Sequence, residues 1–344
     1  MSLTDIALDA MGSDDAPGPE IRGAILACRA FPVRVHLIGP EAKLRAGLGV
    51  LGRRVPIDIV HTDEWITMEE KAAKAVREKR NSTLRLGLKM VKERRAAGFV
   101  TAGNTGAAMA SAKMVLGALP GVERPALAMP LPTSSGSPCV LLDVGANVDC
   151  NVRNLAQFAI MGEMYARAVF KIGKPRVGLL SIGEEESKGN DLTREALQVL
   201  KQLPIRFIGN VEGRDLYSGH ADVIVCDGFV GNVALKTSEG LARMVREMLR
   251  ESLGSTVSGR AGALLARRGF KDFKKRLDQS EYGGAPLLGV RGPVIIGHGS
   301  SDDRAILNGI RVAAEFAASG VTDRIERELN LPNVLQVSRS DDGI

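Results

Sequence analysis

The sequence predicts an α/β fold in which a mainly parallel sheet is covered by helices on both faces. Short runs of apolar or β-branched residues alternate with helix-length stretches along almost all of the 344 residues. Several of these runs are apolar at nearly every position, whereas a strand with one solvated face would alternate apolar and polar residues. Buried strands that alternate with helices are typical of parallel sheets with helices on both sides.

The predicted elements follow one another in a regular order. The strand candidates are the runs "TDIALDA", "VRVHLIG", "PIDIVHT", "GFVTAG", "PCVLLDVG", "PRVGLLSIG", "PIRFIGN", "ADVIVCDG" and "GPVIIGHG". The helix candidates are residues 18–30, 69–79, 105–116, 154–170, 192–201, 232–251 and 304–317. We expect these elements to form a single catalytic domain over residues 1–344.

The composition is that of an ordinary globular protein, with 44% hydrophobic and 25% charged residues. The sequence contains no run of about 18 apolar residues. Its first residues, "MSLTDIALDA", lack the basic and then apolar pattern of a signal peptide. We therefore expect a cytoplasmic chain.

Neither the cysteines nor the histidines show the spacing of a disulfide scaffold or a zinc site. The cysteines are Cys28, Cys139, Cys150 and Cys226, and the histidines are His36, His61, His220 and His298. We expect the cysteines to be reduced residues of the core, and the chain to use no metal and no cofactor.

Residues 253–282 interrupt the alternation and contain no good strand candidate. Seven of the residues between Arg260 and Arg276 are basic and one is acidic, a local excess that equals the formal net charge of +6 for the whole chain. Phe270, Phe273 and Leu277 recur at helical spacing, and an apolar stretch at residues 261–266 precedes them. The pattern predicts a basic amphipathic helical arm.

This arm has two possible roles. It could dock on a membrane surface or a protein partner, or it could be a surface helix that packs on its own domain. Aromatic residues make up only 4% of the chain, which argues against a nucleic-acid-binding protein. The residues that we expect to carry docking are Arg260, Leu264, Leu265, Arg267, Arg268, Phe270, Lys271, Phe273, Lys274 and Lys275.

Six glycine-containing polar turns follow strand candidates: "DAMGSDDAPG", "TAGNTGA", "DVGANVD", "SIGEEESKGND", "CDGFVGN" and "GHGSSDD". Ligands of parallel sheets collect beyond the carboxyl ends of the strands, where helix N-termini attract anions. The turns together predict an anion-binding crevice. The P-loop motif is absent, and the glycine pattern "GLGVLG" at residues 47–52 follows a helix-like stretch and precedes a strand, the reverse of a dinucleotide-binding site.

Two residues of these turns are candidate hydrogen-bond donors to a developing oxyanion. They are Lys188 in "EEESKGND" and Asn232 in "DGFVGN". Alternatively, Lys188 neutralises the glutamates at 184–186, and Asn232 is a plain helix N-cap.

Taken together, the turns resemble one family, the bacterial phosphate acyltransferases (PlsX). The resemblance runs from about residue 5 to about residue 330 and includes "IALDAMGSDDAP", "TAGNTGA", "DVGANVDC", "GLLSIGEEESKGNDLT" and "VCDGFVGNVALKTSEG". It implies a three-layer α/β/α fold related to phosphotransacetylases and to isocitrate and isopropylmalate dehydrogenases. It also implies a homodimer that converts acyl-(acyl carrier protein) and inorganic phosphate to acyl phosphate and free carrier protein, and so feeds glycerol-3-phosphate acylation in phospholipid synthesis.

The resemblance also assigns residues to the reaction. Lys188 and Asn232 would stabilise the oxyanion during direct attack of phosphate on the thioester. Substrate-binding positions would be Asp9, Gly12, Asp14, Gly103, Asn104, Thr105, Gly106, Asn147, His298 and Ser300. The family is peripherally membrane-associated, which implies that the arm contacts an anionic membrane, the acidic carrier protein or the downstream acyltransferase.

The sequence departs from the family pattern at a few positions. Ser13 and Asp15 stand where Gly and His are usual, Ser181 where Asn is frequent, and Asp302 where Asn is common. Because Asp15 adds negative charge near the expected phosphate crevice, no catalytic role is assigned to that position.

Three other functions remain open from the sequence. A phosphotransacetylase-like enzyme would use coenzyme A and would need no basic docking arm. An NAD-dependent decarboxylating dehydrogenase would need an aspartate cluster for a metal ion. A membrane scaffold without catalytic activity would tolerate the substitution Lys188→Ala.

Overall fold

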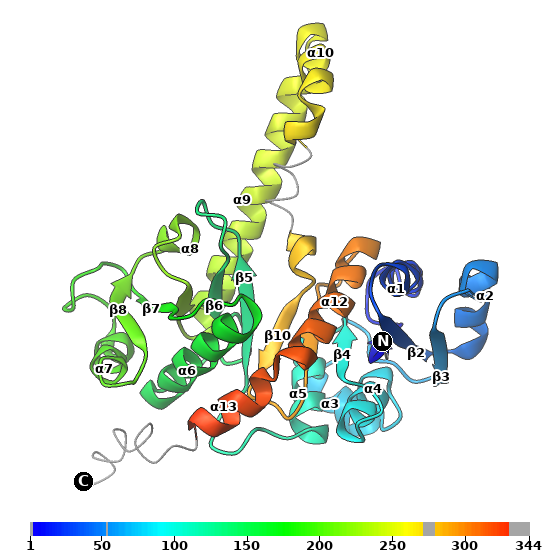
Figure 1. Ribbon diagram of the computed structural model, residues 1–344, viewed down its shortest axis with the longest axis horizontal. Coiled ribbons are helices and arrows are strands. Elements are labelled where there is room, and N and C mark those ends of the chain that lie inside the picture. Colours follow the sequence, from blue (N-terminus) through cyan, green and yellow to red (C-terminus); the bar gives the residue numbers. More distant parts are fainter. Residues whose placement is uncertain (1–2, 53, 271–278, 330–344) are drawn as a thin grey trace.

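The computed structural model describes residues 3–52, 54–270 and 279–329 of the chain (Figure 1). In this part of the chain, eleven strands form one sheet in the order β3-β2-β1-β4-β11-β10-β5-β6-β9-β7-β8. Seven of the ten strand pairings are parallel, and three are antiparallel. The predicted α/β fold with a mainly parallel sheet is confirmed.

The N-terminal half of the sheet is parallel. It contains β1 (Thr4–Asp9), β2 (Val33–Gly39), β3 (Ile57–His61) and β4 (Gly98–Thr101), and β11 (Val294–Ile296) adds in parallel beside β4. Five helices connect the first four strands and lead out of β4: α1 (Gly18–Ala30), α2 (Glu41–Gly52), α3 (Ala72–Glu78), α4 (Thr83–Lys92) and α5 (Thr105–Val115). The "GLGVLG" stretch lies inside α2, so its glycine pattern does not form a strand-to-helix turn.

The other half of the sheet is also parallel within itself. Its strands are β6 (Cys139–Leu142), β7 (Arg176–Leu180), β8 (Arg206–Val211) and β9 (Val223–Val225). Its helices are α6 (Val152–Val169), α7 (Asp191–Leu200) and the short α8 (Asp215–Ser218).

Two strands that the sequence did not predict join the halves. They are β5 (Ala126–Leu131) and β10 (Ala285–Leu288), which pair with each other and with their outer neighbours in antiparallel orientation. A 3₁₀ helix, η1 (Gln279–Tyr282), precedes β10. Proline lies inside both strands, at Pro130 and Pro286, which removes a ladder donor and hides the strand signal.

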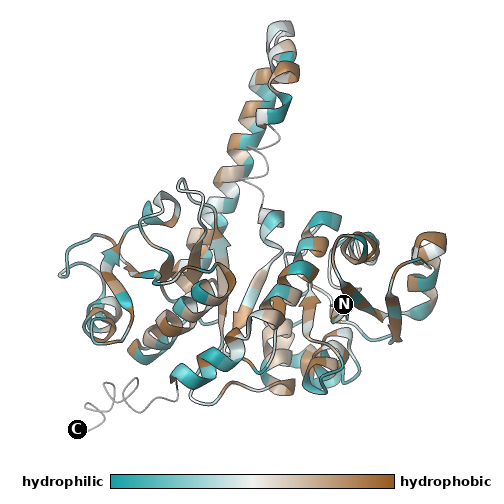
Figure 2. Cartoon of the chain, viewed as in Figure 1, coloured by the Kyte–Doolittle hydropathy of each residue, from teal (hydrophilic) through white to brown (hydrophobic). Residues whose placement is uncertain are grey.

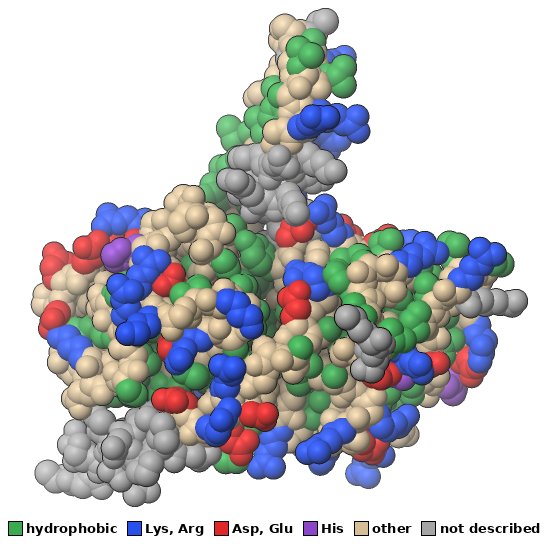
Figure 3. All heavy atoms as spheres, viewed as in Figure 1, with side chains coloured by type: hydrophobic (Ala, Val, Ile, Leu, Met, Phe, Trp, Pro, Cys, Tyr) green, Lys and Arg blue, Asp and Glu red, His purple; other side chains and the backbone are tan. Residues whose placement is uncertain are grey.

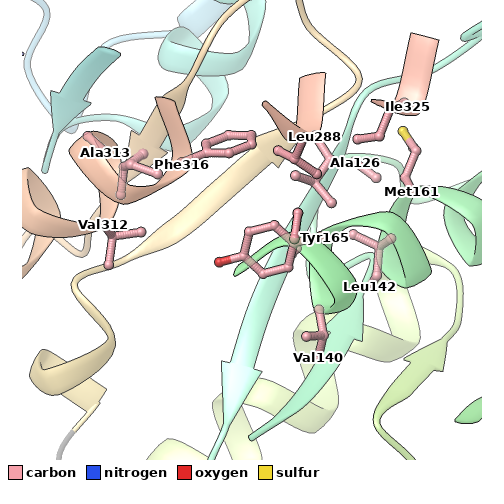
Figure 4. Packing of buried hydrophobic residues seen from close by; sticks show 14 of the residues in the cluster. Ala126, Val140, Leu142, Met161, Tyr165, Leu288, Val312, Ala313, Phe316 and Ile325 are labelled. Atoms are coloured by element: carbon pink, nitrogen blue, oxygen red, sulfur yellow. The ribbon is translucent and has the colours of Figure 1, made fainter. Parts of the chain in front are cut away.

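The core lies on both faces of the sheet. Helices α1, α6, α12 (Asp303–Ser319) and α13 (Val321–Leu329) contribute buried residues to one cluster, and α3, α4 and α5 to the other. Tyr165 of α6 meets Phe316 of α12 edge to face, with ring centroids 6.0 Å apart, and so ties the two halves together (Figure 4). Figure 2 shows strands that are largely apolar under helices with polar outer faces.

A helical protrusion stands out from the body (Figure 1). It is formed by α9 (Gly228–Gly254), whose 27 residues span about 40 Å, and by α10 (Val257–Leu265), which packs against it. The protrusion therefore begins earlier than the segment 253–282 predicted from charge. Within the described ranges, the helices include none with the length and apolar character needed to span a membrane.

The predicted apolar stretch at residues 261–266 lies at this tip. Leu264 and Leu265 are 71% and 89% exposed, and Arg260, Arg267 and Arg268 are exposed beside them. Phe270 is half-buried. The other predicted docking residues, Lys271, Phe273, Lys274 and Lys275, lie outside the described residues.

Candidate functional site

A cavity of about 630 Å³ lies along the foot of α9. It is walled by the N-termini of α5 and α12, by β5, by the turn after β6 and by the turn after β11. Figure 3 shows hydrophobic side chains where the protrusion joins the body, between the two halves of the sheet. Five of the predicted site residues line the cavity: Thr105, Gly106, Asn232, His298 and Ser300.

The cavity is lined by both apolar and polar groups. Apolar side chains come from α5, β5, the turn after β6, α9 and β11, namely Met109, Leu127, Met129, Val144, Leu235 and Ile296. Polar groups come from α9, from the turn before α12, whose first N–H groups are capped by Asp302, and from the first turn of α5, whose backbone N–H groups carry partial positive charge. Such a cavity suits a substrate with an apolar chain and an anionic reacting group.

The turn after β6 is organised by Asp143. Its buried carboxylate accepts hydrogen bonds from the backbone N–H groups of Ala146 and Asn147, at 3.0 and 2.7 Å, and from that of Leu127 at 3.0 Å. Burial raises the pKa of this carboxyl, although the hydrogen bonds act in the opposite direction. The sequence analysis missed Asp143, because only the fold shows how many donors converge on it.

Asn232 is placed by the close approach of α9 to this turn. A Cβ at Gly231 would collide with the carbonyl oxygen of Asp143, so only glycine allows this packing. The side chain of Asn232 then lies against Gly145.

Asn232 is not the N-cap of α9. That position is taken by Asp227, whose carboxylate accepts from the N–H of Val230 at 2.9 Å. Among the residues that the structure describes, the Asn232 amide has no hydrogen-bond partner and faces the cavity. The alternative that Asn232 only caps the helix is therefore wrong.

Asn104 does not line the cavity, although its neighbours Thr105 and Gly106 do. It caps α5 by accepting from the N–H of Ala107 at 3.0 Å, and its Nδ2 donates to the carbonyl of Glu70 at 3.1 Å. The side chain therefore holds the segment before α3 against α5 and does not line the cavity.

The predicted residues at the end of β1 and in the turn after it do not line the cavity but bond to the turns beside it. Asp9 is buried, and its carboxylate accepts from Thr101 Oγ1 at 2.8 Å; burial raises its pKa. Gly12 packs against Gly103, and a Cβ at Gly12 would lie 2.8 Å from the Gly103 nitrogen. The N–H of Asp14 donates to the carbonyl of Gly299 at 2.8 Å, which links this turn to the turn after β11.

The turn after β11 places the ring of His298 against Ser300. His298 Nδ1 lies 2.8 Å from Ser300 Oγ and accepts from the N–H of Ser300 at 3.2 Å. Asp302 caps α12 at the end of the same turn by accepting from the N–H of Ala305 at 2.9 Å.

Asn147 and Lys188 also lie outside the cavity lining. Asn147 is bound within its own turn and donates through Nδ2 to the carbonyl of Pro125 at 2.8 Å. Lys188 is exposed in the turn between β7 and α7. Gly145 follows β6, Asn232 follows β9 and Lys188 follows β7. Because these three strands are parallel neighbours, all three residues come after the carboxyl ends of strands at the same edge of the sheet.

Two of the three glutamates beside Lys188 have other ion-pair partners. Glu184 pairs with Arg214 at 2.7 Å, and Glu186 pairs with Lys201 at 2.6 Å. In the described part of the chain, the Lys188 ammonium has no ion-pair partner. The alternative that Lys188 serves to neutralise these glutamates is therefore wrong for Glu184 and Glu186.

The charged face of α9 was not predicted from the sequence. Lys236, Glu239, Arg243 and Arg246 all line the cavity beyond Asn232. Their spacing of three or four residues was visible in "NVALKTSEGLARMVR", but which face of the helix meets the body is set by the tertiary structure.

Comparison with known proteins gives the family. Residues 4–324 match the family described as fatty acid synthesis protein. The chain is 68% identical over 332 residues to a phosphate acyltransferase of Acidobacterium capsulatum, covering 96% of this chain and 98% of the relative. It is 62% identical to one of Koribacter versatilis, covering 94% and 92%. The chain belongs to the phosphate acyltransferase family.

As a phosphate acyltransferase, the chain is an enzyme that transfers acyl groups with phosphate. Solved structures agree in fold. A phosphotransacetylase from Streptococcus pyogenes is similar with a TM-score of 0.63 at 18% identity, over 92% of this chain and 94% of that one. A branched-chain phosphotransacylase from Enterococcus faecalis gives 0.59 at 13% identity, over 92% and 99%.

Proposed function

We propose that this phosphate acyltransferase takes its acyl group from acyl carrier protein and passes it to inorganic phosphate. The observation that carries the proposal is the cavity along α9, in which apolar walls meet the N-terminus of α5. The walls suit a fatty acyl chain, and the helix N-terminus suits phosphate.

In the proposed reaction, a phosphate oxygen attacks the carbonyl carbon of the thioester. The new C–O bond forms, the tetrahedral oxyanion collapses, and the C–S bond breaks with the electron pair leaving on the thiolate. The products are acyl phosphate and free carrier protein. Thiolate is a good leaving group, so the chain needs mainly to place phosphate and to stabilise the oxyanion.

Asn232 supports this mechanism because its amide is unpaired at the cavity wall. We assign it to the oxyanion, with Lys188 as a second donor from the neighbouring strand end. Thr105 and Gly106 would place phosphate at the N-terminus of α5, while His298 and Ser300 form the opposite wall. Asp9, Gly12, Asp14, Gly103, Asn104 and Asn147 would act by holding the turns in place.

The exposed face of α9 supports a homodimer. Leu241, Met244, Val245 and Met248 recur at helical spacing and are 38–58% exposed. A second copy of the chain would cover this stripe by pairing the two protrusions.

The tip supports contact with an anionic membrane. Leu264 and Leu265 offer apolar side chains, and three arginines surround them. A single short helix of this kind binds reversibly at the surface of a bilayer. Acyl phosphate formed there would feed glycerol-3-phosphate acylation in phospholipid synthesis.

The function is tested by incubating the enzyme with palmitoyl carrier protein and phosphate. Free carrier thiol should be released only when phosphate is present, and hydroxylamine should trap acyl phosphate as the hydroxamate. Palmitoyl-coenzyme A serves as the comparison substrate and should react with a lower kcat/KM. No phosphate-dependent release with carriers of any acyl length would contradict the proposal, and faster reaction with coenzyme A esters would favour the phosphotransacetylase alternative.

A further inference from the structure

The cavity is elongated along α9. Its lining includes Asn232, Lys236, Glu239, Arg243 and Arg246, which follow one face of the helix. At 1.5 Å per residue, Asn232 and Arg243 are about 16 Å apart along the axis, and Asn232 and Arg246 about 21 Å. Because helical side chains tilt toward the N-terminus, the long arginine side chains can reach back along the axis toward Asn232.

The far end of the cavity carries uncompensated positive charge. Lys236 and Glu239 neutralise each other, with Nζ and Oε2 2.8 Å apart. Arg243 and Arg246 are exposed, and neither has an ion-pair or hydrogen-bond partner among the described residues. Two unpaired guanidinium groups on one wall form a site for a phosphate or phosphodiester group.

That anion is not the attacking phosphate. A nucleophile must lie about 3 Å from the carbonyl carbon that it attacks, and we place that carbon beside Asn232. Arg243 and Arg246 are too far along α9 to hold it there. The anion must therefore be another part of the acyl donor.

The phosphopantetheine arm of a carrier protein has this shape. Thirteen bonds join its phosphorus to its sulfur, so by analogy with three bonds per extended peptide residue the arm spans about 15 Å. This length is close to the axial distance of about 16 Å between Asn232 and Arg243, and the Arg246 side chain can reach back toward the same point. We propose that Arg243 and Arg246 bind the phosphodiester of the phosphopantetheine arm and thereby set the thioester beside Asn232.

This inference rests on the proposed carrier-protein substrate, and its test is separate from turnover. The probes are octanoyl-phosphopantetheine and octanoyl-pantetheine in which an amide replaces the thioester, so that no reaction occurs. Calorimetry gives the Kd of each for the full-length protein. The two probes differ only in the phosphate, so the ratio of their Kd values isolates the contribution of that group.

The wild-type chain should bind the phosphorylated probe at least about tenfold more tightly, because charge-assisted hydrogen bonds are roughly twice as strong as neutral ones. In the double variant Arg243→Ala/Arg246→Ala, the ratio of the Kd of octanoyl-pantetheine to that of octanoyl-phosphopantetheine should fall to about one. The KM for inorganic phosphate should stay unchanged within about twofold. Arg250→Ala is the matched control, since it removes the same charge from an exposed position of α9 that does not line the cavity. It should keep the wild-type ratio.

The inference is overturned if the wild type does not distinguish the probes, or if the double variant still does. It is also overturned if the double variant raises the KM for acyl carrier protein while the Kd ratio stays at the wild-type value, since the arginines would then contact the protein surface of the carrier. A wild type that distinguishes the probes but shows no phosphate-dependent acyl transfer would contradict the proposed function and leave the anion site standing.

Discussion

Replacing Gly231 with alanine tests whether the close contact of α9 with the turn after β6 positions Asn232. The added Cβ would collide with the backbone carbonyl oxygen of Asp143, and neither atom is at the flexible end of a side chain. Either the first turn of α9 or the turn around Asp143 must therefore move. Restoring an ordinary contact between a methyl group and a carbonyl oxygen requires a shift of more than about 1.5 Å, and a displacement of about 1 Å at an active site already lowers the rate about 100-fold.

The same substitution should also affect stability. Overpacking of a tight contact costs about 1–3 kcal/mol, which the melting temperature reports. The matched control is Gly240→Ala on the same helix, where a Cβ meets nothing within 4 Å. Alanine in place of an exposed helical glycine should stabilise the protein by about 0.5–1 kcal/mol and leave the activity unchanged.

The assay is phosphate-dependent release of thiol from palmitoyl carrier protein, with melting temperatures measured on the same preparations. We expect Gly231→Ala to lose about 100-fold in kcat/KM while remaining folded, and Gly240→Ala to match the wild type. A Gly231→Ala protein with wild-type activity and stability would refute the argument that this contact sets the position of Asn232.

Three further predictions follow from the structure. Asn232→Ala and Lys188→Ala should each lower kcat about 100-fold or more if both groups stabilise the oxyanion, and an effect on KM alone would contradict that role. Glu20 is buried, and its Oε2 has no hydrogen-bond partner among the described residues. Burial raises the pKa of this carboxyl. Ionisation of Glu20 therefore destabilises the fold as the pH rises through and above the usual carboxyl range. Glu20→Gln should therefore raise the melting temperature at pH 8 by more than at pH 5; a smaller or negative change at pH 8 would be inconsistent with a buried charge. The double variant Leu264→Asp/Leu265→Asp should abolish sedimentation with anionic liposomes. The control Leu51→Asp, at a leucine of the body that is 56% exposed, should sediment like the wild type. Equal binding by both variants would contradict the proposal that the tip contacts the membrane.

The sequence predicted the parallel parts of the fold well, because buried strands and their connecting helices leave local signals. It did not predict β5 and β10. These strands contain Pro130 and Pro286 and are defined by their antiparallel partners, which lie up to about 160 residues away in the chain. Their presence could be recognised only once the two parallel halves were brought together.

The candidate site was also predicted only in part from the sequence. The turn sequences identified Thr105, Gly106, Asn232, His298 and Ser300, which the fold brings around one cavity. The same reasoning could not separate them from Asn104 and Asn147, because a polar turn residue has the same sequence signature whether it faces a ligand or bonds to a neighbouring backbone. Only the positions of the carbonyls of Glu70 and Pro125 decide that these two side chains are held within the protein.

The sequence by itself determined the α/β class, the family, the glycine turns and the basic character of the tip, since each depends on residue types and short spacings. The tertiary structure decided which face of α9 meets the body, which guanidinium groups stand unpaired along the cavity, and how Gly231 brings Asn232 against the turn at Asp143. These features depend on contacts between segments that are distant in the chain, and such contacts exist only after the core has packed.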